Sequence, residues 1–204
     1  MPQVDMEYNP RTGQYRDDNG KVIPKTQILD TIEQERRILE RKIEAHSQNL
    51  ISNSIDEFEW ERRIKRDLKE SHLKMVALGA GGKDNISQRH RGQVGAALRQ
   101  EYNALFDFRK KRQAGEISDR QLVARSKFYS RSLSQSYHRS EQLTRAQNGA
   151  TLAKRTLDPT AKHCPECPGY STRGKFVPIQ NVVPPGTRCS CRGNCKCTVV
   201  YRVA

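Results

Sequence analysis

The sequence is poor in the residues that build a large hydrophobic core. Of its 204 residues, 34% are hydrophobic and 6% aromatic, whereas 29% are charged. Because the hydrophobic share is well below that of an ordinary globular domain, a single bulky core is not expected. The composition instead predicts a mainly α, elongated helical assembly that buries narrow apolar stripes, completed by neighbouring copies or partner proteins.

Long apolar runs are also lacking. No stretch approaches the roughly 20 residues that span a bilayer, so we expect no membrane partner. Residues 1–5 (MPQVD) lack the hydrophobic core of a secretory signal. We therefore expect synthesis in a cytoplasm, where thiols stay reduced and clustered cysteines bind metal more often than they pair.

Acidic residues are too few to balance the basic ones. The chain has 37 Lys and Arg against 23 Asp and Glu, a formal net charge of +14. This excess favours polyanions or acidic protein surfaces as partners, although a basic face on an ordinary soluble protein is the alternative. The run Arg109, Lys110, Lys111 and Arg112 is the candidate contact for nucleic acid such as packaged DNA, and such contact would be electrostatic and sequence-independent.

Signals for an enzyme are missing as well. The glycine-rich segment 79–85 follows a predicted helix and has no Ser or Thr after Lys83, so a flexible linker is favoured over a phosphate loop. His72, His90 and His138 fall on different predicted helices without metal spacing, which indicates solvated or core-edge histidines. The carboxylates are spread along charged helical faces, and no nucleophile motif occurs. We expect no catalytic activity.

Three segments can be separated along the chain. Residues 1–25 contain two turn signals around a polar-aromatic stretch and predict an N-terminal hairpin or extended arm that lies on another surface. Residues 26–150 predict a helical domain. Residues 151–204 hold most of the prolines and all six cysteines, and predict an irregular zinc-binding module with short strands at 175–177 and 198–201.

The helical segment divides into four amphipathic helices. The first covers residues 26–51 and the second starts at Ser54, where Glu57 completes a capping box. The third covers 87–114, and the fourth opens at Ser118 with Gln121 and ends near 148–149. The apolar residues expected to face the core are Ile28, Ile32, Leu39, Ile43, Leu50, Phe58, Trp60, Ile64, Leu68, Met75, Val76, Val94, Ala97, Leu98, Tyr102, Leu105, Leu122, Phe128, Tyr129, Leu133, Tyr137 and Leu143.

The cysteines carry the most specific pattern in the sequence. They form a Cys-x-x-Cys pair, Cys164 and Cys167, and after 21 residues a second group, Cys189, Cys191, Cys195 and Cys197. Two chelating turns joined by a loop are typical of zinc sites, because each turn directs two thiolates at one tetrahedral ion. Four available thiolates favour a structural zinc over a catalytic one, and a disulfide-linked tail is the alternative.

The ligand set stays open at this level. Cys164 and Cys167 are the first choice, joined by Cys195 and Cys197 or by Cys191 and Cys195, with His163 as a less favoured substitute. Another possibility is that all six thiolates share two metal ions. Lys162, Arg188, Arg192 and Lys196 are available to offset the negative charge of the thiolates.

The tail also resembles a known family. The segments 163–167 (HCPEC), 174–179 (GKFVPI), 183–187 (VPPGT) and 194–198 (NCKCT) are similar to the C-terminal signature of tailed-bacteriophage head-morphogenesis proteins, the minor head proteins of the Mu F-like type. In that signature the middle residue of the terminal Cys-x-Cys is Arg, whereas here it is Lys196, and the extra Cys189 and Cys191 also depart from it. The resemblance covers about forty residues.

The resemblance implies a virion protein, made in the host bacterial cytoplasm. Its expected role is that of a minor capsid or head-morphogenesis protein, present in multiple copies and touching capsid, portal or packaged DNA. The alternative is a cytoplasmic zinc protein that binds nucleic acid and regulates transcription or packaging.

Overall fold

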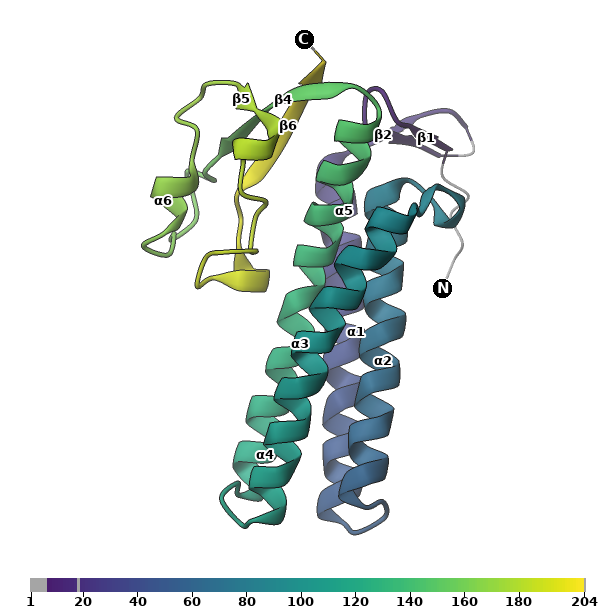
Figure 1. Ribbon diagram of the computed structural model, residues 1–204, viewed down its shortest axis with the longest axis vertical. Coiled ribbons are helices and arrows are strands. Elements are labelled where there is room, and N and C mark those ends of the chain that lie inside the picture. Colours follow the sequence, from purple (N-terminus) through teal and green to yellow (C-terminus); the bar gives the residue numbers. More distant parts are fainter. Residues whose placement is uncertain (1–6, 18, 204) are drawn as a thin grey trace.

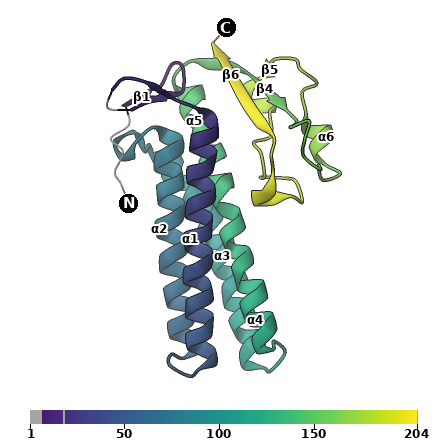
Figure 2. The ribbon, with the colours of Figure 1, turned by 180° about the vertical axis from the view of Figure 1, so that it is seen from behind.

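The computed structural model describes residues 7–17 and 19–203. It is an elongated helical stem that carries two small sheets at one end (Figure 1). The second sheet belongs to the cysteine-rich module, which overhangs one side of the stem, and the view from behind shows the same arrangement (Figure 2). The expected mainly α, elongated architecture with a small irregular C-terminal module is confirmed.

The N-terminal segment forms an antiparallel sheet of β1 (Glu7–Asn9), β2 (Gln14–Arg16) and β3 (Val22–Ile23). In the β1–β2 turn, the Asn9 side-chain oxygen accepts hydrogen bonds from the backbone N–H groups of Arg11 and Thr12. Tyr15 and Ile23 are buried in the core of the stem. The predicted hairpin is thus confirmed for the described part of this segment, and it packs on the end of the helices.

Four helical segments build the stem. They are α1 (Lys25–Ile51), α2 (Glu57–Ala80), α3 (Gln88–Gln113) and a fourth segment of α4 (Asp119–Ser126), the 3₁₀ turn η2 (Lys127–Ser132) and α5 (Leu133–Gln147). The prediction of one continuous fourth helix is wrong at η2. There the hydroxyls of Ser130 and Ser132 donate to backbone carbonyls three residues earlier, which stabilises the tighter 3₁₀ geometry.

The helix ends follow side-chain capping. Ser118 and Gln121 form the predicted capping box at the start of α4. The predicted cap at Ser54 is wrong, because Asp56 caps α2 by accepting a hydrogen bond from the Glu59 N–H at 2.7 Å. A short 3₁₀ turn, η1 (Lys83–Asn85), follows α2, and Gly81 ends that helix with a left-handed backbone, φ +80°. The ring of Tyr8 packs against Gly81, where no side chain would fit.

The hydrophobic core runs as a stripe along the whole stem. The predicted α1 face of Ile28, Ile32, Leu39, Ile43 and Leu50 is buried throughout. Opposite it lie buried residues from the other helices: Trp60, Ile64, Leu68, Met75, Val76, Val94, Leu98, Leu105, Leu122, Leu133 and Tyr137.

Two phenylalanines expected in the core are not there. Phe58 is 64% exposed and Phe128 is 50% exposed. Each lies beneath a guanidinium group instead, since Arg109 lies 4.2 Å from the centre of the Phe58 ring and Arg131 the same distance from that of Phe128.

A set of buried polar contacts accompanies the core. Glu35 accepts hydrogen bonds from Ser71 and Lys74, and His72 lies between Ser136 and Glu101. The expectation that His72, His90 and His138 are solvated or at the core edge is corrected, because all three are buried. Buried polar groups need partners, so these contacts fix how the helices align.

His90 makes stability depend on pH. Its Nδ1 accepts a hydrogen bond from the Ser87 backbone N–H, and its Nε2 lies 3.3 Å from the Ser140 carbonyl oxygen, an arrangement that needs a neutral ring. Burial lowers the pKa of His90 below its ordinary 6.5. The unfolded chain therefore takes up this proton at a higher pH than the folded one. The contribution of neutral His90 to the free energy of unfolding is complete above about pH 6.5 and is lost as the pH falls below that value.

We therefore expect the thermal midpoint to fall between about pH 7 and pH 5.5. In His90→Gln the side chain keeps an acceptor for Ser87 but does not titrate, so the decline should be shallower. Burial also lowers the pKa of His138, so part of the decline should remain. Differential scanning calorimetry over a pH series measures how steeply the thermal midpoint changes with pH in the unchanged protein and in His90→Gln. Equal slopes in the two proteins would contradict the role of His90.

A second antiparallel sheet, of order β5-β4-β6, organises the C-terminal module. It consists of β4 (Ala150–Thr156), β5 (Val177–Pro178) and β6 (Thr198–Val203). The strands predicted at 175–177 and 198–201 overlap β5 and β6. The central strand β4 was not predicted. Among the described residues, no helix combines the length and apolar character needed to cross a membrane.

Candidate metal centre

All six cysteines lie in the connection between two paired strands. β4 ends at Thr156 and β6 begins at Thr198, and these two residues are direct partners in the antiparallel ladder. The intervening chain carries the short helix α6 (Cys167–Tyr170) and the 3₁₀ turns η3 (Ile179–Asn181) and η4 (Arg192–Asn194). Pairing of β4 with β6 therefore brings the first and second cysteine groups together although 21 residues separate them.

Each cysteine group is held in a tight turn. In the first, the Cys167 N–H donates to the Cys164 carbonyl; in the second, the Arg192 N–H donates to that of Cys189. A contact between the groups aligns them, since the Ser190 hydroxyl donates to the Glu166 carboxylate at 2.9 Å. These backbone turns direct the sulfur atoms inward.

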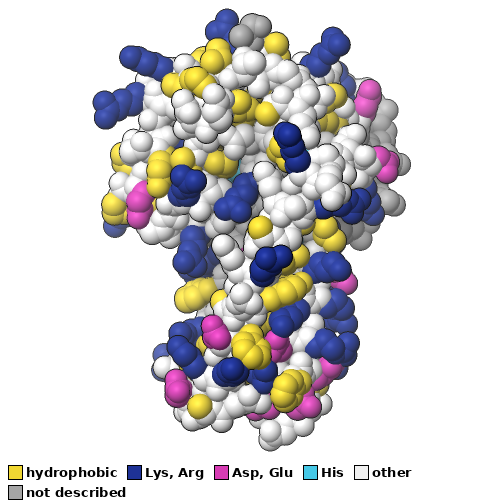
Figure 3. Space-filling model, viewed as in Figure 1, with side chains coloured by type: hydrophobic (Ala, Val, Ile, Leu, Met, Phe, Trp, Pro, Cys, Tyr) yellow, Lys and Arg dark blue, Asp and Glu magenta, His cyan; other side chains and the backbone are white. Residues whose placement is uncertain are grey.

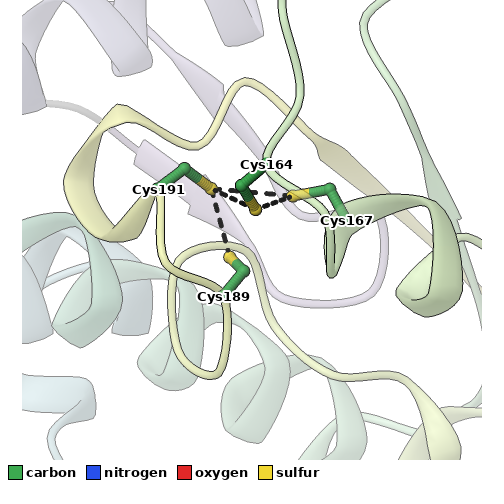
Figure 4. A group of neighbouring side chains, drawn as sticks. All are labelled: Cys164, Cys167, Cys189 and Cys191. Carbon is green, nitrogen blue, oxygen red and sulfur yellow. Dashed lines mark hydrogen bonds between the residues drawn. The ribbon is translucent and has the colours of Figure 1, made fainter.

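Four sulfur atoms converge, those of Cys164, Cys167, Cys189 and Cys191, all within 4.8 Å of one another (Figure 4). The Cys164 sulfur lies 3.4 Å from that of Cys167 and 3.5 Å from that of Cys191, which lies 3.3 Å from the Cys189 sulfur. A tetrahedral ion with metal–sulfur bonds of about 2.3 Å places its sulfurs about 3.8 Å apart. The cluster thus has nearly the size that a tetrathiolate site requires.

The other two cysteines also lie close to Cys167. The Cys195 sulfur is 3.9 Å from that of Cys167, and His163 and Cys197 form a second group with Cys167 within 4.8 Å. All six cysteines are free thiols, so the alternative of a disulfide-linked tail is not what the structure contains. Cys167 is shared by both groups, and its buried position makes it the central residue of the cluster.

The structure therefore brings together three of the five predicted ligands, Cys164, Cys167 and Cys191, and adds Cys189. The preferred ligand sets of the sequence analysis left out Cys189, which entered only the alternative in which all six thiolates share two metal ions. The Cys189-x-Cys191 spacing was the available signal, because two thiolates separated by one residue can also face one ion. The Glu166–Ser190 contact, which joins residues distant in sequence, links the turn of Cys189 and Cys191 to that of Cys164 and Cys167.

Arg155 lies beneath the sulfur cluster and was not predicted. It projects from β4, is fully buried, and donates from Nη1 to the Val183 carbonyl at 2.8 Å. Its Nη2 lies 3.5 Å from the Cys167 sulfur and 3.6 Å from the Cys195 sulfur. The sequence interpretation assigned charge compensation to other basic residues, but Arg188, Arg192 and Lys196 are solvent-exposed. The buried cation beside the sulfurs is Arg155.

The electrostatics of the cluster favour a bound cation. Burial raises the pKa of Cys167 and Cys191 well above the ordinary value of a thiol. Burial also opposes ionisation of Cys164, but hydrogen bonds from the Cys191 backbone and from the Cys167 and Cys191 thiols together outweigh it, and the pKa of Cys164 falls to about 6. Without a metal, the sulfurs cannot all be thiolates at once. A divalent cation would displace the remaining protons and offset about half of the negative charge of four thiolates, and Arg155 would offset part of the rest.

The other segments of the tail signature form a strand and a turn of the same module. Val177 and Pro178 form β5 beside β4. The Pro-Pro-Gly segment is a turn in which the Thr187 hydroxyl donates to the Pro184 carbonyl, and Gly186 adopts φ +76° with its Cα packed against the Arg192 carbonyl. The turn thus returns the chain to the second cysteine group.

Contact at Gly193 joins the module to the stem. A Cβ atom on this glycine of η4 would lie 2.2 Å from the Arg131 carbonyl oxygen of η2. Gly193→Ala must therefore push the module away from the stem, at a cost of about 1–3 kcal/mol, and lower the thermal midpoint by several degrees. The matched control is Gly169→Ala in α6, where nothing lies within 4 Å of the added atom. Calorimetry of both variants checks this, and equal midpoints would exclude the proposed docking.

Of the four basic residues on α3 that the sequence predicted to contact nucleic acid, two are ion-paired and two are exposed. Arg109 is buried and forms an ion pair with Glu61. Arg112 is paired with Asp119, so neither guanidinium is available as an unpaired surface charge. Lys110 and Lys111 remain exposed. The four residues therefore do not form the continuous basic contact that the sequence predicted, because helical spacing turns Arg109 toward α2.

Comparison with known proteins gives no relatives. No protein-family model, no curated protein and no solved structure matches this chain. The cysteine cluster, rather than a family, is therefore the basis for assigning a function.

Proposed function

We propose that the C-terminal module binds one structural zinc ion through Cys164, Cys167, Cys189 and Cys191. The observation that carries this proposal is the convergence of four free thiols at nearly tetrahedral spacing. All-sulfur coordination suits zinc, and four protein ligands leave no open position for catalysis. The role is therefore structural, and we propose no enzymatic activity.

Elemental analysis of the reduced protein tests this directly. We expect one equivalent of zinc per chain after purification without added metal. Absence of any stoichiometric transition metal would contradict the proposal. Two equivalents would support the other arrangement, in which Cys195, Cys197 and His163 complete a second site that shares Cys167.

We further propose that the chain is a tailed-bacteriophage virion protein of the minor capsid or head-morphogenesis type. The tail resemblance supports this, because one of its segments holds Cys164 and Cys167 and another forms β5 beside β4. A long stem with a narrow core and an overhanging module also offers much surface to neighbours. In this proposal the partners are capsid or portal proteins, and the chain is present in multiple copies in the particle.

Mass spectrometry of purified particles tests the virion role. We expect the chain at a fixed copy number relative to the major capsid protein. Its presence only in the lysate, outside the particle fraction, would contradict the proposal and favour a cytoplasmic regulatory or packaging protein.

A further inference from the structure

A broad groove runs between the stem and the cysteine-rich module. It has a volume of about 890 Å³, and its walls come from α3, α4, η2 and α5 on one side and from the chain between Glu166 and Arg192 on the other. The space-filling view shows Lys and Arg side chains gathered at the waist where the module overhangs the stem (Figure 3). Six basic residues line the groove: Lys111, Arg125, Arg131, Arg139, Arg188 and Arg192.

The positive charges of the groove lack acidic partners. None of the six basic residues forms an ion pair with a carboxylate in the described part of the chain. Three carboxylates also line the groove: Glu101 pairs with His72, Glu166 accepts hydrogen bonds from Ser190, and Asp107 offsets one of the six positive charges without forming an ion pair among the described residues. Elsewhere on the stem, arginines such as Arg36 and Arg63 do find glutamates at helical spacing.

Two arginines line the groove from its two walls. Arg139 belongs to α5 and Arg188 to the module, and Arg139 is partly buried. Burial, together with the charge of Arg188, lowers the pKa of Arg139. Folding therefore places like charges near each other, and neither arginine forms an ion pair within the described residues, an arrangement that a bound anion would stabilise.

An exposed aromatic ring lies among these charges. Phe128 lines the groove and is half exposed, and the guanidinium of Arg131 lies 4.2 Å from the centre of its ring. Arg131 covers part of this ring, and the exposed part remains accessible to a ligand in the groove. A basic groove with an accessible aromatic ring is the combination that single-strand binders use, with phosphates on the cations and a base on the ring.

We propose that this groove binds a single-stranded segment of nucleic acid. Arg139 and Arg188 contact its phosphates, and Phe128 stacks on a base. A duplex keeps its bases paired and stacked inside the helix, so it has no free base to place on Phe128. The proposal does not depend on the virion role, since it follows from the charges and the ring in the groove. It does require the module to be folded, because Arg188 directly precedes Cys189 and Arg192 directly follows Cys191.

Fluorescence anisotropy of the full zinc-loaded chain with a labelled oligothymidylate of about 16 nucleotides tests the proposal. Arg139→Gln combined with Arg188→Gln should weaken binding at least about tenfold at low salt, and the loss of two phosphate contacts should reduce the salt slope by about 1.4. Phe128→Ala, at an exposed site that the fold does not need, should weaken binding by about tenfold through lost stacking.

The matched control is Arg89→Gln combined with Arg91→Gln. Both arginines are exposed on α3, outside the groove, and this variant has the same net charge as the groove variant. It should retain most of the affinity. Equal losses in the two double variants would overturn the proposal, because binding would then follow net charge alone. Binding of a duplex or of polyglutamate as tight as that of the oligothymidylate would also overturn it.

Discussion

Removal of zinc by a chelator is expected to unfold the cysteine-rich module while the helical stem stays folded. The module has little else to hold it, since its apolar cluster consists of Ala150, Ala153, Ile179, Val182 and Val199. Zinc binding in comparable small modules contributes about 10–16 kcal/mol, far more than such a cluster. The stem has its own continuous core and should not need the metal.

Limited proteolysis with circular dichroism measures this effect. After chelation, cleavage should appear within residues 157–197 while most of the helical signal remains, and added zinc should restore protection. Cys167→Ser should behave like the chelated protein, because Cys167 belongs to both sulfur groups. Cys195→Ser, outside the group of four, should keep its zinc. Unchanged cleavage after complete removal of zinc would show that the module folds without it.

Replacement of Arg155 by Met is expected to destabilise the module by about 3–5 kcal/mol, as removal of one partner from a buried charged contact does. The methionine fills most of the volume but leaves the Val183 carbonyl without its donor and the sulfurs without their buried cation. Zinc affinity should fall by about 10–100-fold, as it does when a group that supports metal ligands is lost.

Urea denaturation and zinc competition with a chromophoric chelator measure the two effects of Arg155→Met. Arg202→Met is the matched control, because Arg202 is exposed on β6 and its removal changes the net charge equally. The control should change stability by less than about 1 kcal/mol. If the two variants behaved alike, Arg155 would have no special role beside the cysteines.

The helical stem could be predicted from the sequence because its signals are local. Apolar spacing on α1 identified a face that is buried throughout, and Ser118 with Gln121 marked the start of α4. Reading helices from apolar spacing failed at η2, where serine hydroxyls donate to backbone carbonyls and stabilise the tighter 3₁₀ geometry. It also failed at Phe58 and Phe128, since an aromatic ring at helical spacing can pack under an arginine instead of in the core.

The central strand of the module escaped prediction for a clear physical reason. The inward residues of β4 include Ala150, Ala153 and Arg155. Two small side chains and a buried arginine give no alternating hydrophobic pattern, so periodicity could not reveal the strand. Its long-range pairing with β6, rather than local propensity, makes it a strand.

The sequence by itself determined a mainly α chain with a basic surface and a tail whose cysteines gather in two groups, because composition, helical periodicity and chelate spacing are properties of neighbouring residues. Only the tertiary structure decided that Cys189 joins Cys164, Cys167 and Cys191, that Arg155 supplies the buried charge, and that Arg139 and Arg188 line one groove. Each of these contacts joins residues far apart in the chain. Their distances depend on how the strands pair and on how the module docks at Gly193.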